Sequence, residues 1–253
     1  SGSGIDVVVD VDADPLDADT SDTEPEVVEC DYFADPIASG SMGDGSEASP
    51  WGSLESLAEL GLLPAGGGTI CLLDGYHGTP RIIGVRPSAP LSLRSRNLHG
   101  AVVGTIALQD SADLTFDGLL VDGATVIDAS TVERESFLVT ADATSSPLAF
   151  ENMIVQSADA SDTWTIEDWR LLSRSGMDLR GTHATVSETV IRNTYHALSV
   201  RGDHAVVEGN LIDNFAGDAI RGLGSHSTYA WNTVRDAYID EYEVQHDDAF
   251  QAY

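Results

Sequence analysis

The sequence predicts an all-β chain whose strands wind into a parallel β-solenoid, and three observations lead to this fold class. Stretches of the second half resemble each other at a fixed spacing of 21 to 22 residues. Each copy contains short alternating strands separated by Gly, Asn and Asp. The segments between the strands are too short for the helices that βαβ units need. A period of this length suits one coil of a solenoid.

The repeat is clearest where the copies beginning at Met177 and Leu198 are superimposed, at an offset of 21 residues. A third copy follows after one extra residue, and weaker copies cover 114–122 and 148–156. An antiparallel β-sandwich is the alternative, but it does not produce residue-level similarity at a fixed spacing. At roughly 22 residues per coil, residues 69–253 would make about eight coils, stacked over ~40 Å. The aligned pairs include His183 with His204, Val186 with Val207, Ile191 with Ile212, and Asn193 with Asn214.

The elements before the coils are predicted in chain order. Residues 5–29 carry ten acids and no base, which predicts a self-repelling disordered linker over 1–29. A calcium loop around Asp10, Asp12 and Asp14 is less well supported, because the Gly and the late Glu of an EF-hand are missing. The β-helix domain is expected to run from residue 30 to 253.

Residues 31–68 are expected to form a strand over 32–35 and then an α-helix that caps the first coil, as solenoids require. Leu54, Leu57 and Ala58 fall on one helical face, and Ser49 with Pro50 resembles a helix start. The chain stops inside the strand-like residues 250–253. An open or truncated end is therefore predicted there, with further coils or a partner beyond it.

Cys30 and Cys71 are too far apart in sequence for a CxxC motif, which leaves two buried thiols or one disulfide. If the strand at 32–35 lies beside 69–73, the two cysteines meet at the same end of their strands. This pairing favours a disulfide.

Several N-terminal motifs resemble those of secreted right-handed parallel β-helix proteins of the pectate-lyase-like superfamily. The resemblance covers about residues 31–253 and implies the right-handed fold, export from the cell and a carbohydrate ligand. It does not choose among the lyases, hydrolases, epimerases and binding proteins of that superfamily. The motifs are Asp35-Pro36, Gly43-Asp44-Gly45-Ser46, Pro50-Trp51 with Leu54, Thr69 to His77, 217–224, and 246–251.

Charge restricts the partners. The chain has 42 acidic residues and 12 basic ones, all arginine, for a net charge of −30. A broad basic face for nucleic acid or anionic lipid is therefore not expected. No run approaches the roughly 18 apolar residues of a membrane span. This composition suits a secreted or cell-surface protein.

Strand alternation predicts one functional face. If Met177, Leu198, Ile220 and Phe250 point inward, three rows of side chains face outward from the same strands. Three of the twelve arginines then lie in one strip, where they would bind a linear acidic polysaccharide bidentately. The alternative is a ladder of surface ion pairs. The outward rows are Asp178, Ser199, Arg221 and Gln251; Arg180, Arg201 and Tyr253; and Ser175, His196, Asp218 and Asp248.

These residues support three functional hypotheses. The first is a polysaccharide lyase, or a C5-epimerase, that abstracts the C5 proton of a uronic acid. The candidate bases and charge neutralisers are Arg201, Arg221, His226 and His246. The family resemblance implies that an arginine can serve as the base. Arg180, Asp178, Gln251, Trp164 and Trp169 would bind substrate. The second is a glycoside hydrolase that uses Asp218, Asp247 and Asp248 as acid and base. The third is a non-catalytic glycan-binding protein.

Two features have alternative interpretations. The same Asp218, Asp247 and Asp248 could hold Ca²⁺, and no organic cofactor is expected. Trp164 and Trp169 lie in a long segment, 159–176, that is either a groove wall or a helix packed on the solenoid. The column of His183, His204 and His226 is expected to stack in successive turns rather than to form a compact tetrahedral metal site.

Overall fold

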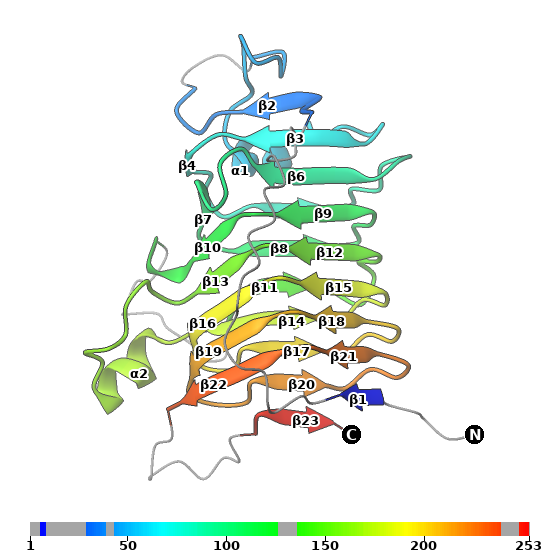
Figure 1. Cartoon of the computed structure of the whole chain (residues 1–253). Helices are drawn as coiled ribbons and strands as arrows, with labels where there is room; N and C mark the ends of the chain where they lie inside the picture. The colour runs from blue at the N-terminus through cyan, green and yellow to red at the C-terminus, as the bar shows by residue number, and fades with distance from the viewer. Residues whose placement is uncertain (1–5, 9–28, 39–42, 126–135, 239–247, 253) are drawn as a thin grey trace, which may run out of the picture.

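The computed structural model describes residues 6–8, 29–38, 43–125, 136–238 and 248–252, and shows a right-handed parallel β-helix (Figure 1). Three parallel sheets run along the axis, and each coil contributes one strand to each sheet. We call them sheet 1, with nine strands, and sheets 2 and 3, with seven each.

In spatial order, sheet 1 is β1 (Asp6–Val8), β21 (Thr228–Ala230), β18 (Val206–Glu208), β15 (Ala184–Ser187), β12 (Leu148–Glu151), β9 (Leu114–Asp117), β6 (Leu91–Ser95), β3 (Gly68–Leu72) and β2 (Tyr32–Ala34). Sheet 2 is β22 (Thr233–Ala237), β19 (Leu211–Phe215), β16 (Val190–Thr194), β13 (Ile154–Gln156), β10 (Leu120–Asp122), β7 (Ala101–Val103) and β4 (Gly75–Tyr76). Sheet 3 is β23 (Phe250–Ala252), β20 (Ile220–Gly222), β17 (Leu198–Val200), β14 (Ser175–Leu179), β11 (Phe137–Ala141), β8 (Ile106–Gln109) and β5 (Arg81–Ile83).

The core is a set of columns, because the parallel register places equivalent residues of successive coils directly above one another. Phe116 pairs with Phe150, and their rings stack at 5.4 Å; both side chains are fully buried. Val186 and Val207 continue the same column.

The sheets contain seven three-strand coils, close to the predicted eight. The difference arises because the coils that contain 126–135 and the helix α2 (Ile166–Leu172) are longer than 22 residues.

Polar ladders hold the turns between sheets 1 and 2, where Asn210 and Asn232 lie in successive coils. The Asn210 Nδ2 donates to Asn232 Oδ1 at 2.9 Å, and Asn210 Oδ1 accepts from the Thr189 amide at 3.0 Å. Asn152 lies one register position earlier, in line with Glu188 and Gly209, and donates to Asp117 Oδ1 at 2.8 Å. These bonds satisfy amides that a tight bend would leave unpaired.

The first coil is covered by β2 and by the helix α1 (Leu54–Glu59), as predicted. The helix begins later than Ser49 suggested: Ser53 is the N-cap, and its side chain accepts from the Ser56 amide. Residues before it are extended, because Trp51 forms a parallel bridge with Ala34. Leu54 and Leu57 are fully buried against the first coil.

The N-terminal segment differs from the predicted linker at one point. Residues 6–8 form β1, which pairs in parallel with β21 of the last coil. The neighbours of β21 in sheet 1 are thus β18 and β1, so part of the open edge expected at that end is covered by the chain itself.

The predicted disulfide forms between Cys30 and Cys71, whose Cα atoms are 5.7 Å apart. It follows from the pairing of β2 with β3, which sets Phe33 beside Cys71. In the described part of the chain, no helix has the length and hydrophobicity to span a membrane.

Reducing this disulfide should lower the free energy of unfolding by roughly 4 kcal/mol, because the bond closes a 41-residue loop. Urea unfolding with and without a phosphine reductant measures the change. The Cys30→Ser/Cys71→Ser double variant should reproduce the loss and be insensitive to the reductant. Equal stability of the oxidised and reduced forms would contradict this estimate.

His77 should make stability depend on pH. Its imidazole is fully buried, accepts from the Leu54 amide at 3.2 Å through Nδ1, and donates to the Leu73 carbonyl at 2.7 Å through Nε2. Burial lowers the pKa of His77 and outweighs the opposing effect of the Leu73 contact. The neutral ring therefore stabilises the fold fully above the unfolded pKa of about 6.5, and the contribution declines as pH falls below that value.

The matched measurement compares unfolding free energies from about pH 7 to pH 5. His77→Gln retains a donor and an acceptor and should show a flatter decline than the parent protein. His99→Gln, which replaces a histidine in a turn, is the control, and its unfolding free energy should fall with pH as steeply as that of the parent. Identical slopes for the parent and His77→Gln would show that His77 does not couple folding to pH.

Candidate functional site

One outward row of sheet 3 runs the length of the solenoid. The register confirms the predicted alignment: Met177, Leu198, Ile220 and Phe250 share an inward column. The row beside it lies on the other side of the strands, where Asp178 and Ser199 are buried, at 2% and 0% exposed. The same row extends to the first coil, beyond the copies that the sequence aligns. Its members are Arg81, Ala107, Thr140, Asp178, Ser199, Arg221 and Gln251.

Asp178 organises two arginines at the middle of this row. Its Oδ2 lies 2.7 Å from Arg180 Nε, and its Oδ1 lies 2.7 Å from Arg201 Nε. The carboxylate is 2% exposed, whereas the arginine side chains are 57% and 39% exposed. Both bonds use Nε, so the terminal nitrogens of the two guanidinium groups remain available to a ligand. The predicted ion-pair ladder is thus present, and it also presents cations to solvent.

A second cluster surrounds Asp218. Its Oδ2 lies 3.3 Å from Arg221 Nε and 3.6 Å from His196 Nδ1, and its Oδ1 accepts from the Asp248 amide at 3.2 Å. His196 Nδ1 accepts from the Asp218 amide at 2.9 Å, which assigns the ring proton to Nε2 when the ring is neutral. Arg221 Nε also reaches Gln251 Oε1 at 3.2 Å. Asp218 therefore fixes the positions of the neighbouring groups.

A groove of about 330 Å³ lies between the first coil and the Asp178 cluster. Arg81 and Arg180 are among its lining residues, with Gln109, Thr140 and Asp142. Arg81 is exposed, and no carboxylate of the described chain forms a salt bridge with it. The groove therefore contains one arginine without a carboxylate partner among the described residues, Arg81 of β5, and one arginine that shares Asp178, Arg180 directly after β14.

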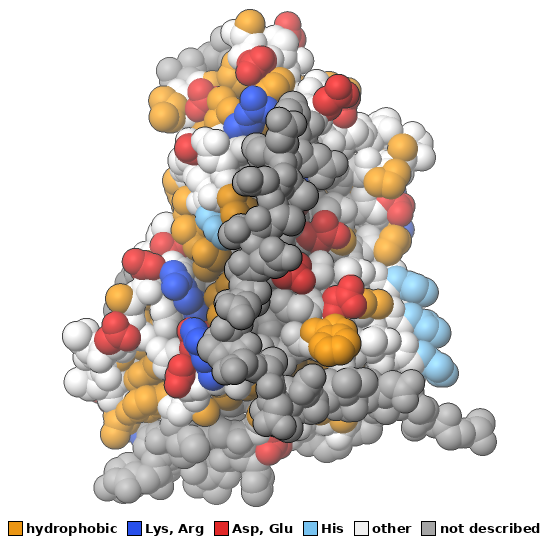
Figure 2. All heavy atoms as spheres, in the orientation of Figure 1, with side chains coloured by type: hydrophobic (Ala, Val, Ile, Leu, Met, Phe, Trp, Pro, Cys, Tyr) orange, Lys and Arg blue, Asp and Glu red, His pale blue; other side chains and the backbone are white. Residues whose placement is uncertain are grey.

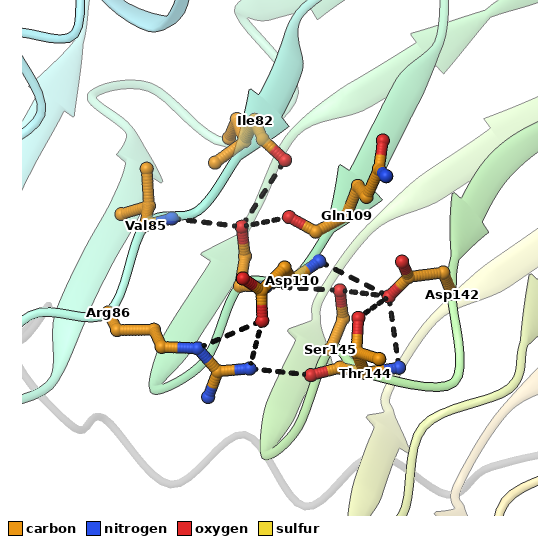
Figure 3. A network of polar contacts seen from close by, with 9 residues as sticks. Ile82, Val85, Arg86, Gln109, Asp110, Asp142, Thr144 and Ser145 are labelled. Atoms are coloured by element: carbon orange, nitrogen blue, oxygen red, sulfur yellow. Dashed lines mark hydrogen bonds and ion pairs between the residues drawn. The ribbon is translucent and has the colours of Figure 1, made fainter.

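The polar network beside this groove holds Asp142 in place (Figure 3). One oxygen of Asp142 accepts from the Thr144 and Ser145 hydroxyls, both at 2.8 Å, and from two backbone amides. Partial burial opposes ionisation, but these hydrogen bonds outweigh it and lower the pKa of Asp142. Arg86 joins the network by pairing with Asp110 at 2.6 Å.

Several predicted site residues lie elsewhere. Trp169 is 3% exposed and packs edge-on against Trp164 at 4.9 Å and face-on against Tyr238 at 5.0 Å. This corrects the expectation that Trp169 stacks on sugars: it anchors α2, whose capping box between Thr165 and Asp168 forms as the sequence suggested. Trp164 is half-buried in the same cluster.

The remaining predictions divide between the turns and the undescribed residues. His226 stacks in the turn ladder with His204 and is not part of the outward row of sheet 3. His246, Asp247 and Tyr253 lie outside the described residues. The roles assigned to them stay predictions.

Calcium does not fit the described part of its predicted site. Arg221 already pairs with Asp218, and the contact from Asp248 is made by its backbone amide rather than its carboxylate. Throughout the described ranges, no group of three or more His, Cys, Asp or Glu side chains is arranged to hold a metal ion. We therefore assign no step to calcium, and a requirement for it stays a prediction.

The sequence alignment missed four residues that line the groove, because the early coils have diverged from the repeat. They are Arg81, Gln109, Thr140 and Asp142. The alternating segment Arg81-Ile82-Ile83 between Pro80 and Gly84 was the available signal.

Comparison of the chain with known proteins matches no family model, no curated protein and no solved structure. The resemblance to the pectate-lyase-like superfamily thus stays a prediction.

Replacing Asp178 should destabilise the protein. Asp178→Asn removes the charge shared by two arginines and should lower the free energy of unfolding by about 1–3 kcal/mol. The loss is smaller than for a fully buried ion pair, because the arginine side chains are exposed to solvent. Asp110→Asn, at an exposed pair with Arg86, is the control and should cost less than about 1 kcal/mol. Equal losses in urea unfolding would show that Asp178 is not a structural anchor.

Proposed function

We propose that sheet 3 binds a linear acidic polysaccharide of the uronic-acid class. The observation that carries the proposal is the groove with exposed Arg81 from one end of the row and Arg180 from its middle. Arg201 and Arg221 continue the positive side chains over the next two coils. Guanidinium groups bind carboxylates through two parallel hydrogen bonds, which suits a polymer with one carboxylate per sugar.

The shape of the row supports a linear ligand. The five strand-to-strand steps from β5 to β20 span ~24 Å. Four arginines lie among four carboxylates, Asp142, Asp178, Asp218 and Asp248, so acids and bases are equal in number on this face, whereas the whole chain has 42 acids and 12 arginines. A polyanion repelled by the rest of the protein would therefore be directed to this face.

The disulfide supports an exported location for this activity, because such bonds persist mainly in oxidising compartments. Polysaccharides of this class would be met there. The secreted or cell-surface location remains part of the proposal.

Calorimetric titration with oligogalacturonate and oligomannuronate, with neutral dextran as a blank, tests this function. Arg81→Gln should weaken binding about tenfold, because it removes one charge-assisted contact without disturbing a partner. Arg235→Gln on sheet 2, where Arg235 pairs with Asp213, should bind like the parent. Binding that is absent in the parent, or unchanged in Arg81→Gln, would contradict the proposal.

A lyase reaction is a second candidate, favoured by the two arginines fixed at 2.7 Å on Asp178. Arg180 would neutralise the uronate carboxylate while a base removes the C5 proton. The electron pair of that C–H bond forms the C4–C5 double bond, and the glycosidic oxygen leaves and takes up a proton. Arg201 is the proposed base, and Arg221 is a further neutraliser on the next coil.

Ultraviolet absorbance of the unsaturated product tests this reaction. Arg201→Gln should abolish the signal, and Arg81→Gln should mainly raise KM. New reducing ends without that absorbance would favour hydrolysis by Asp218 and its neighbours. Exchange of the C5 proton with solvent deuterium, without cleavage, would indicate epimerisation. If none of these products forms on any uronate, with or without calcium, the reaction is excluded and the binding proposal is unaffected.

A further inference from the structure

A column of histidines stands on one edge of the solenoid, in the turns that lead from sheet 3 to sheet 1 (Figure 2). His183 and His204 stack with ring centroids 5.1 Å apart, and His204 and His226 do so at the same spacing. All three side chains are exposed. The sequence predicted this stack from the alignment of the repeats.

The backbone explains why the rings align. Each histidine follows a Gly-x pair and lies in the left-handed region, with φ between 56° and 61°. Gly202 and Gly224 sit so close to the carbonyl of the preceding coil that a Cβ there would lie within 2 Å of it. The turns are therefore superimposed. In the two preceding coils the same place in the turn holds Asp113 and Pro147.

The turn itself does not need imidazole, since Asn or Gly adopts the left-handed region more readily. The rings add nitrogen atoms at the surface. His183 Nδ1 contacts the Thr182 hydroxyl at 3.1 Å. Within the described chain, the rings of His204 and His226 form no hydrogen bond, so their nitrogens are open to solvent.

We propose that this histidine column binds one divalent transition-metal ion of the Zn²⁺, Cu²⁺ or Ni²⁺ type. Neutral imidazole is the preferred ligand of these ions, and it predominates above about pH 7. Hard ions such as Ca²⁺ prefer oxygen and are not expected here. His204 belongs to both neighbouring pairs, so the column provides one site rather than two.

Binding requires the stack to close. A Zn²⁺ bound at about 2.0–2.1 Å to two nitrogens needs those atoms roughly 3 Å apart, which is closer than the stacked rings allow. Exposed rings reach this geometry by tilting toward each other about Cα–Cβ and Cβ–Cγ. Oδ1 of Asp203, directly before His204, accepts from the Ser225 amide at 2.7 Å, so Oδ2 of Asp203 and water would supply the remaining oxygen ligands. This rearrangement accounts for the lack of a ready-made metal cluster among the described residues.

The test is calorimetric titration of untagged protein with ZnCl₂ at about pH 7.5, with spectroscopy of bound Cu²⁺ to report nitrogen ligation. The parent should bind one ion, and its affinity should fall as the pH is lowered, because protons compete with the metal for imidazole nitrogen. His204→Asn retains the left-handed turn and should bind at least about tenfold more weakly. His99→Asn, outside the column, should bind like the parent.

Thermal melts of both variants establish that they fold. No saturable binding by the parent would overturn the proposal. So would equal affinity of the parent and His204→Asn, which would place the ion elsewhere on this acidic surface. A Cu²⁺ spectrum that shows oxygen ligands alone would also overturn the proposal.

Discussion

The parallel register of the coils is the constraint on which this structure depends. Because neighbouring strands run parallel at a spacing of ~4.8 Å, every residue lies over its equivalent in the next coil. Whatever chemistry one coil provides is therefore repeated along the axis. The buried columns of Phe and Val, the Asn ladder, the arginine row and the histidine column all follow from that repetition.

Stacking like charges would be costly, and the structure shows how the cost is reduced. On sheet 3 the arginines alternate with carboxylates or hydroxyls: Asp178 lies between Arg180 and Arg201, and Ser199 separates Asp178 from Arg221. This arrangement holds the guanidinium groups without using all of their donors. A face that is structurally balanced can still present positive groups to an acidic ligand, although the chain as a whole has a charge of −30.

Much of the fold could be predicted from the repeat, because a fixed spacing with inward alternation specifies the register directly. The pairing of Met177 with Leu198, and the disulfide near the paired strands β2 and β3, followed from that logic. Helix α1 was placed too early because Ser49 and Pro50 imitate a cap, whereas Trp51 joins the sheet through Ala34. Arg81 was missed because its coil has lost the repeat. The role of Trp169 depended on whether its segment packs on the solenoid, which local sequence does not specify.

The central claim is that the four arginines of the sheet 3 face, Arg81, Arg180, Arg201 and Arg221, bind the ligand. Nitrogen-15 NMR of the arginine Nε–H groups tests it directly, since the chain has only 12 arginines and no lysine. On titration with a uronate oligosaccharide, the signals of Arg81, Arg180 and Arg201 should shift together, and those of Arg192 and Arg235 on sheet 2 should not. Shifts confined to sheet 2, or none at saturating oligosaccharide, would contradict the account.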